Sequence, residues 1–190
     1  MRNRKRLLWL AAAVLVIAGV AGGVWFGHYR DKPHHFAVVK PDVLYRTGQP
    51  DAKGWEWIMA RYPIKTVLDL RPPGEDAPAY ALEESFCREH GLELVDMPMS
   101  RDGHPPTQEQ FAQFLDLVRN PSRQPVLVHC EFGSLRTGVL AAAYRILEEG
   151  WSYDRAYSEA NGLRFNREKA PEDDAFLRDL EKNRSASAPR

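Results

Sequence analysis

The chain has 190 residues, of which 44% are hydrophobic, and this size suits one globular domain rather than two. The formal net charge is zero, but four of the 26 basic side chains lie within the first six residues. The remaining residues therefore carry 22 basic groups against 26 acidic ones. This acidic balance argues against a nucleic-acid partner.

An uncharged apolar segment follows the basic residues 1–6. Residues 7–27 contain no charged side chain, and their length is close to the roughly 20 residues that cross a bilayer as a helix. Trp25 near the end of the segment is typical of a membrane interface, so we expect a retained single-pass anchor. Whether or not the segment is retained, residues 1–6 should stay in the cytoplasm, with everything after His28 exported. A cleaved signal segment is the alternative, because the small residues 19–21 would suit cleavage.

Residues 28–40 are polar and predict a linker to the domain. Their three histidines have no acidic or thiol partner at ligand spacing, so we expect no metal site there. The domain itself is expected over residues 41–183, and the polar residues 184–190 predict a disordered tail.

Within the domain, strand and helix patterns alternate. This alternation predicts an α/β fold with a central, mostly parallel sheet flanked by helices. Strands are expected at residues 43–48, 65–70, 92–97 and 125–129, and helices at 51–59, 77–91, 107–118 and 136–149, with two more beginning near residues 152 and 171.

The stretch "HCEFGSLRTG" connects the last predicted strand to the helix that begins at Arg136. A helix N-terminus has unpaired N–H groups and a partial positive charge, which bind tetrahedral oxyanions. Gly133 allows the loop backbone to curl until several amides point inward. The same field stabilises a thiolate, so we expect Cys130 to be ionised and nucleophilic near neutral pH. The planar fork of Arg136 can bind two phosphate oxygens at once.

This loop resembles the His-Cys-x-x-Gly-x-x-Arg-Ser/Thr signature of the cysteine-based protein tyrosine phosphatases. With "LYRTGQP" near the domain start and "YRILEEGW" after the loop, residues 41–165 are similar to the bacterial exported dual-specificity phosphatases. The resemblance is strong at the loop and weaker elsewhere. It implies an inner-membrane protein whose catalytic domain lies on the periplasmic side.

The resemblance also implies hydrolysis of a phosphate monoester without metal or cofactor. Cys130 would attack the phosphorus and form a cysteinyl-phosphate, which water then hydrolyses. Thr137 would donate a hydrogen bond to the sulfur, and His129 would orient the loop from behind. The phosphate would be bound by the loop residues Glu131, Phe132, Gly133, Ser134, Leu135 and Arg136.

The leaving group needs a proton, and family members place an aspartate on a loop roughly 30 residues before the cysteine. Asp96 and Asp102 lie 34 and 28 positions before Cys130. Asp96 falls inside a predicted strand, whereas Asp102 follows Pro98 in a loop. We therefore expect Asp102 to be the general acid.

Two other side chains can be interpreted as either structural or functional residues. Cys87 lies in a predicted helix, where we expect a buried structural thiol; resolving an oxidised Cys130 is the alternative. Two cysteines are too few for a disulfide framework. Arg71 follows a strand end, and we expect a surface salt bridge there rather than a contact with the site.

The loop residues 131–135 add no lysine or arginine to Arg136. Multiply phosphorylated inositol rings would require more positive charge, so a phosphorylated protein, with phosphotyrosine favoured, is the expected substrate. Another phosphate monoester, such as a lipid head group, is the alternative substrate. The competing functions are a catalytically silent phospho-binding module and sulfur transfer. We expect a monomer.

Overall fold

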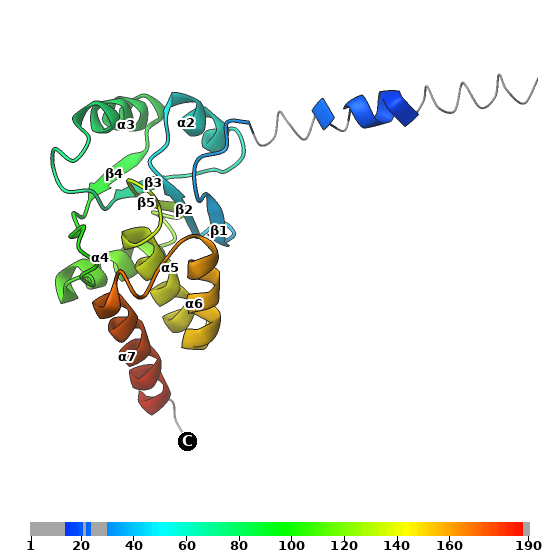
Figure 1. Ribbon diagram of the computed structural model, residues 1–190. Helices are drawn as coiled ribbons and strands as arrows, with labels where there is room; N and C mark the ends of the chain where they lie inside the picture. The colour runs from blue at the N-terminus through cyan, green and yellow to red at the C-terminus, as the bar shows by residue number, and fades with distance from the viewer. Residues whose placement is uncertain (1–13, 21, 24–29, 188–190) are drawn as a thin grey trace, which may run out of the picture. The chain divides into compact units, whose positions relative to one another are not determined.

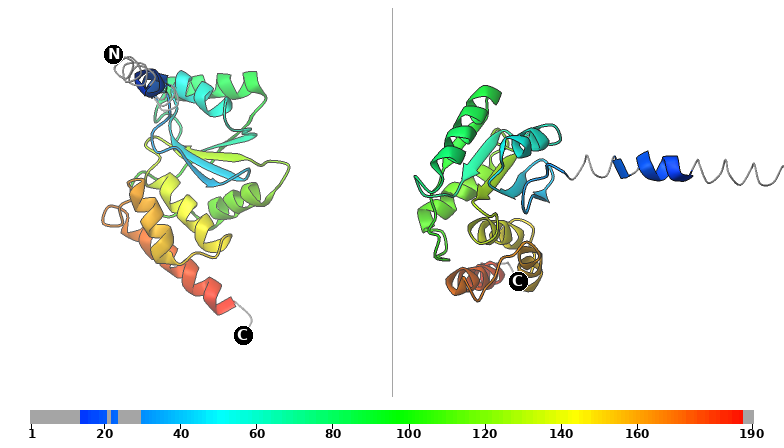
Figure 2. Two further views of the ribbon diagram at one scale, coloured as in Figure 1. Left: turned by 90° about the vertical axis from the view of Figure 1, so that its right-hand side faces the viewer. Right: turned by 45° about the horizontal axis from the view of Figure 1, so that its top comes forward.

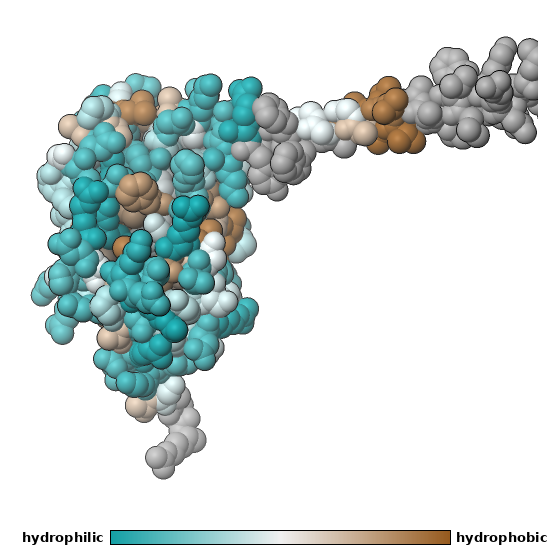
Figure 3. Space-filling view, viewed as in Figure 1, coloured by the Kyte–Doolittle hydropathy of each residue, from teal (hydrophilic) through white to brown (hydrophobic). Residues whose placement is uncertain are grey.

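The computed structural model describes residues 14–20, 22–23 and 30–187, in two compact units, 1–32 and 33–190. In the first unit, residues 14–20 are helical and expose apolar side chains (Figure 3). The rest of the predicted anchor, apart from residues 22–23, lies outside the described residues. Within the part of the chain that is described, no helix has both the length and the apolar character of a membrane span.

The second unit contains a five-stranded mixed sheet (Figure 1). The strand order is β1-β2-β5-β3-β4, with β1 antiparallel to β2 and the other pairs parallel. The expected α/β fold with a mostly parallel sheet is thereby confirmed. The strands are β1 (Ala37–Lys40), β2 (Leu44–Gly48), β3 (Thr66–Asp69), β4 (Glu93–Asp96) and β5 (Val126–Cys130).

Helices cover both faces of this sheet (Figure 2). One face carries α2 (Ala52–Met59) and α3 (Ala77–His90), and the other carries α4 (Gln108–Arg119), α5 (Arg136–Leu147), α6 (Tyr153–Gly162) and α7 (Pro171–Ser187). Successive strand residues point to opposite faces. In β5, Val126 and Val128 therefore join the core beneath α4–α7, and Leu127 joins the core beneath α2 and α3.

The helix boundaries agree with the expected capping signals. The Asp51 carboxylate accepts a hydrogen bond from the Gly54 N–H at 2.7 Å, and Thr107 with Gln110 forms a capping box at α4. Gly91 ends α3 with φ +66° in the left-handed region.

Two boundaries differ from the sequence-based expectation. Residues 33–40 form part of the domain rather than a linker, because Phe36 is buried against aromatic rings and residues 37–40 form β1. At the other end, residues 184–187 continue α7 where a disordered tail was expected, and residues 188–190 lie outside the described residues.

Candidate active site

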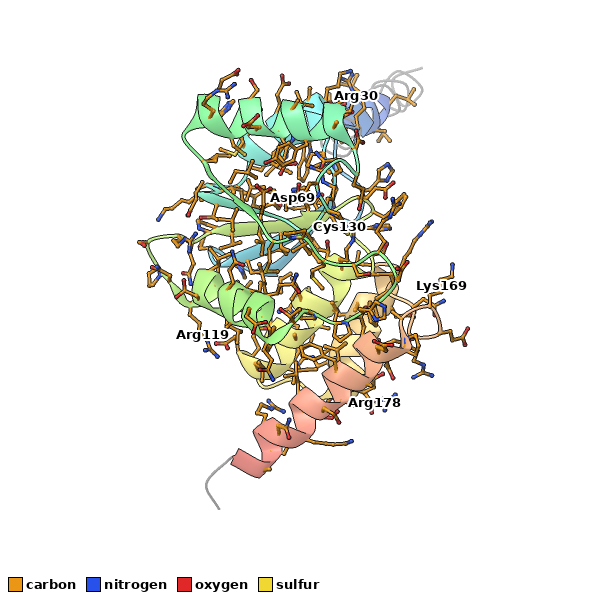
Figure 4. The ribbon with its side chains drawn as sticks, turned by 90° about the vertical axis from the view of Figure 1, so that its left-hand side faces the viewer. Arg30, Asp69, Arg119, Cys130, Lys169 and Arg178 are labelled. Atoms are coloured by element: carbon orange, nitrogen blue, oxygen red, sulfur yellow. The ribbon has the colours of Figure 1, made fainter. Side chains whose placement is uncertain are left out.

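Cys130 lies at the carboxyl end of β5, a central strand, and Arg136 is the first residue of α5. Asp69, the last residue of the neighbouring β3, is in register with His129, and both Asp69 and Cys130 are labelled in Figure 4. A cavity of about 190 Å³ opens above the sulfur. It is lined by Arg101, Cys130, Glu131, Phe132, Ser134, Leu135 and Arg136. The structure thus brings the predicted nucleophile, the predicted arginine and most of the connecting loop to one cavity.

Three successive carbonyl groups of this loop are hydrogen-bonded away from the cavity. The donors come from the segment 35–49: the His35 ring, the Arg46 guanidinium and the Gln49 N–H. The acceptors are the carbonyl oxygens of Phe132, Gly133 and Glu131, respectively. Because a trans peptide directs its C=O and N–H groups to opposite sides, the following N–H groups face the cavity. The Gly133 N–H donates to the Cys130 sulfur at 3.3 Å.

Glycine is required at position 133 for two reasons. Its φ of +67° lies in the left-handed region, which disfavours side chains. A Cβ atom there would also lie 2.4 Å from the Gly48 nitrogen and 2.6 Å from the Thr47 carbonyl carbon. The loop can therefore pack directly against the end of β2, which holds its amides in place.

Glu75 fixes the guanidinium of Arg136. Nη1 and Nη2 of Arg136 donate to the two carboxylate oxygens of Glu75 at 2.9 and 2.7 Å, and Nη1 also reaches the Leu70 carbonyl. This pairing uses one N–H of Nη2, so the Nε–H and the second N–H of Nη2, which form the other edge of the guanidinium, have no partner among the described residues and can bind an oxyanion. Burial opposes the charge, but Glu75 and the Cys130 sulfur raise the pKa of Arg136 above its usual value. Sequence reasoning missed Glu75, which lies 61 residues away.

Behind the strand, His129 belongs to a buried ionic network. Its Nε2 lies 2.7 Å from a Glu83 carboxylate oxygen, and Arg71 pairs with both Glu83 and Asp69 at 2.7 and 2.8 Å. Burial disfavours the imidazolium, yet Glu83 raises the pKa of His129. The expected surface salt bridge of Arg71 was wrong, because all four side chains are buried. Although Asp69, Glu83 and His129 are close enough together to hold a metal ion, Arg71 already supplies a cation between the two carboxylates.

A second buried arginine, Arg46, lies beneath the loop. Only 1% of its surface is exposed, and its one hydrogen bond within the described structure goes to the Gly133 carbonyl. Burial lowers the pKa of Arg46 to about 10, although the nearby Cys130 and Glu159 favour its charge. Arg46 therefore combines two functions, since it turns the Gly133 peptide and places a positive charge below the sulfur. No role was predicted for this side chain, although it lies in the stretch "LYRTGQP" that carries part of the family resemblance.

Two predicted site residues, Thr137 and Asp102, make no hydrogen bond to Cys130 within the described structure. The Thr137 hydroxyl is buried and has no hydrogen-bond partner among the described residues, so the expected bond to the Cys130 sulfur is not present. Asp102 is exposed in the loop between β4 and α4, and its N–H donates to the Ser100 hydroxyl. Its neighbour Arg101 lines the cavity instead and pairs with Glu131 at 2.8 Å.

The alternative acid, Asp96, is also absent from the residues that line the cavity above the sulfur. The Asp96 carboxylate accepts a hydrogen bond from the Tyr80 hydroxyl at 3.0 Å and lines a different cavity, next to Arg71. The choice of Asp102 over Asp96 therefore stays a prediction, supported by the position of Arg101 on the same loop.

Cys87 lies on α3 and is 2% exposed. Burial, with the negative charge of Glu83, raises the pKa of its thiol to about 12. Its neighbours belong to the core beneath α2 and α3, whereas Cys130 belongs to the core on the opposite face of the sheet. This placement fits the structural interpretation of Cys87.

Comparison with known proteins places this site in a family. Residues 34–179 match the family described as DSP-PTPase phosphatase fused to NAD+ kinase. Among curated proteins, the chain is 29% identical to the inositol diphosphatase SIW14 of Saccharomyces cerevisiae over 141 residues, or 73% of this chain and 48% of SIW14. It is 27% identical to the dual specificity protein phosphatase TpbA of Pseudomonas aeruginosa over 177 residues, or 83% of this chain and 73% of TpbA. The match thus spans about half of the length of SIW14.

Solved structures of these two relatives have a similar fold. The core catalytic domain of the PP-IP phosphatase SIW14 from S. cerevisiae, in complex with citrate, superposes with a TM-score of 0.66 at 25% identity, covering 82% of this chain and 93% of that domain. The structure of P. aeruginosa TpbA superposes with a TM-score of 0.60 at 24% identity, covering 82% and 92% of the two chains. The TpbA superposition supports the fold alone.

The position of Arg46 leads to a first prediction. In a Cys130→Ser background, Arg46→Met should weaken the binding of inorganic phosphate by about 10-fold or more, because a charge and the hydrogen bond that orients the Gly133 peptide are both lost. Arg46→Lys, which keeps the charge and one donor, should retain part of the affinity. Isothermal titration calorimetry measures both. Equal affinity in the Met variant and its parent would show that Arg46 only fills space.

Proposed function

The chain belongs to the DSP-PTPase phosphatase family that is described as fused to NAD+ kinase, and we propose that it hydrolyses phosphate monoesters through a cysteinyl-phosphate on Cys130. One observation carries this proposal: the sulfur, the inward-facing loop amides and the free edge of Arg136 all border a single cavity. Such a cavity fits a tetrahedral dianion next to a nucleophile. A catalytically silent phospho-binding module would need the same anion cradle, formed by the loop amides and Arg136, but would not need the sulfur.

In the first step, the phosphate oxygens accept hydrogen bonds from the loop amides and from Nε and Nη2 of Arg136. The Cys130 thiolate attacks the phosphorus, so an S–P bond forms while the bond to the ester oxygen breaks. Asp102 gives its proton to that leaving oxygen. The charge on the three remaining oxygens is stabilised by donors that are already in place, which lowers the barrier without reorganisation of the site.

In the second step, water attacks the phosphorus of the cysteinyl-phosphate. Asp102, now ionised, takes a proton from this water, and the S–P bond breaks to release inorganic phosphate and the thiolate. The Gly133 N–H hydrogen bond at 3.3 Å stabilises the departing sulfur. By the family resemblance, Thr137 adds a second hydrogen bond after its hydroxyl turns toward the sulfur.

Phosphotyrosine in a protein is the substrate we favour. Phe132 is 61% exposed at the rim of the cavity, where its ring can pack against an aryl group. TpbA of P. aeruginosa has been solved in complex with pTyr, which adds support from a relative of this fold. The similarity to the inositol diphosphatase SIW14 makes an inositol diphosphate the second candidate.

Replacing the nucleophile gives the most direct assay of this function. Cys130→Ser should abolish phosphate release from a phosphotyrosine peptide, since an alcohol is not ionised at neutral pH and the S–P intermediate cannot form. Malachite-green detection of phosphate measures the rate. Equal rates in the variant and the parent would exclude the mechanism. A higher kcat/KM on an inositol diphosphate than on the peptide would favour the second substrate.

The general acid is tested separately. Asp102→Asn should lower kcat by roughly 10²- to 10⁴-fold on a phosphate ester with a poor leaving group, because the proton donor is removed. Asp96→Asn serves as the matched control and should change kcat much less. If the Asp96 variant shows the larger loss, the two assignments must be exchanged.

We further propose that residues 7–27 anchor the protein in the inner membrane, with the catalytic domain on the periplasmic side. The exposed apolar side chains of residues 14–20 support this proposal, because the described residues of their own unit offer them no core to pack against. Fractionation of cells that express the full chain should then recover it with membranes, and a protease added to spheroplasts should degrade the domain. Recovery in the soluble fraction would contradict a retained anchor.

A further inference from the structure

The loop between β4 and α4 is held against the phosphate loop by an ion pair. This acid loop comprises residues 97–107. Nη2 of Arg101 donates to a Glu131 carboxylate oxygen at 2.8 Å, and Nε of Arg101 lies 3.8 Å from a Glu75 carboxylate oxygen. Both Arg101 and Glu131 line the cavity above the sulfur. The pair therefore bridges the two loops at the wall of the catalytic cavity.

The carboxylate of Glu131 is unfavourable for anion binding. It directly follows the nucleophile in the sequence and lies on the wall of the cavity. It is also close enough to Arg136 to act on its charge: burial opposes the ionisation of that guanidinium, but Glu75, the Cys130 sulfur and Glu131 all raise its pKa. A carboxylate in this position repels a phosphate dianion in the same cavity, because like charges destabilise each other. Phosphate binding therefore requires a cation beside Glu131.

Arg101 supplies that cation only while the acid loop lies against the phosphate loop. Glu75, the second carboxylate near Arg101, already accepts hydrogen bonds from both Nη atoms of Arg136. Glu131, by contrast, has Arg101 as its only ion-pair partner among the described residues. If the acid loop moved away, the charge of Glu131 would be left uncompensated beside the cavity.

The other side of the acid loop is attached to a different element. A Cβ atom on Gly103 would lie 3.0 Å from the Ala170 Cα, so the two backbones are in direct contact. Next to it, Nδ1 of His104 lies 2.7 Å from a Glu172 carboxylate oxygen at the start of α7. Asp102 lies between this attachment and the ion pair at the cavity, so its position depends on both.

We propose that Glu131 and Arg101 are positioning residues that couple the position of the acid loop to phosphate binding. When they are paired, they hold Asp102 beside the cavity and cancel the charge of the carboxylate. When they separate after hydrolysis, the free carboxylate repels inorganic phosphate and promotes its release. This inference rests on the proposed function, in which phosphate binds above Cys130.

A double-mutant cycle measures this coupling without turnover. In a Cys130→Ser background of the full chain, isothermal titration calorimetry measures the affinity for inorganic phosphate. Arg101→Gln should weaken binding by about fivefold or more, because Glu131 is left uncompensated. Adding Glu131→Gln should return the affinity to within about twofold of the parent, because the repelling charge is removed. If Arg101 bound phosphate itself, its replacement would weaken binding equally with and without Glu131→Gln, and this outcome would overturn the proposal.

Arg119→Gln is the matched control. Arg119 pairs with Glu148 at 2.7 Å, its side chain is 57% exposed compared with 56% for Arg101, and it does not line the cavity. Its replacement removes the same charge and should leave the phosphate affinity within about twofold of the parent. An equal fall in this control would assign the effect to net charge and overturn the pairing. Absence of phosphate binding in the Cys130→Ser parent would instead contradict the proposed function itself.

The effect on Asp102 is measured in the active enzyme. Glu131→Gln should slow release of a poor leaving group in the first turnover by about threefold or more, because the acid loop loses its attachment to the phosphate loop. Glu131→Asp, which keeps the charge, should recover part of this rate, whereas Arg119→Gln should not change it. A first-turnover rate that is unchanged in Glu131→Gln would contradict the positioning of Asp102 by this pair.

Discussion

The outward orientation of three successive carbonyl groups in residues 131–133 is the constraint on which the site depends. Hydrogen bonds from the segment 35–49 hold these carbonyls away from the cavity, so that the amides which follow them face it. Gly133 makes this possible because its missing side chain lets the loop lie directly on the end of β2. The segment that begins at Pro33 thus contributes to the anion cradle from a position far from it in sequence.

Three arginines around Cys130 illustrate how the same side chain serves different purposes. Arg136 lies beside the sulfur with one edge held by Glu75 and the other edge free. Arg46 lies beneath the loop with a single hydrogen bond, and Arg71 neutralises two buried carboxylates behind β5. A buried charge is costly unless it is paired. The incompletely paired Arg46 is therefore the one whose burial favours an anion at the sulfur and the phosphate.

Patterns that depend on neighbouring residues were predictable. Capping residues such as Thr107 and the alternation of strands and helices indicated the α/β fold, and the spacing of Cys130 and Arg136 indicated the cradle. Contacts between distant segments were not predictable. The Phe132 carbonyl accepts a hydrogen bond from His35, which lies 97 positions away in the sequence. Arg71 is buried because it pairs with Glu83, which belongs to another element. The edge strand β1 was missed because its four residues carry no alternating pattern of hydrophobic and polar side chains.

Protection of Cys130 from alkylation tests the central claim most directly. Iodoacetamide should modify Cys130 at neutral pH, and inorganic phosphate should slow this reaction in a saturable manner, because the anion occupies the cradle above the sulfur. Cys87 provides an internal reference, since burial raises the pKa of its thiol to about 12 and keeps it unreactive. Mass spectrometry of the two cysteine-containing peptides separates the signals. A Cys130 that reacts at the same rate with and without saturating phosphate would contradict an anion-binding loop around this sulfur.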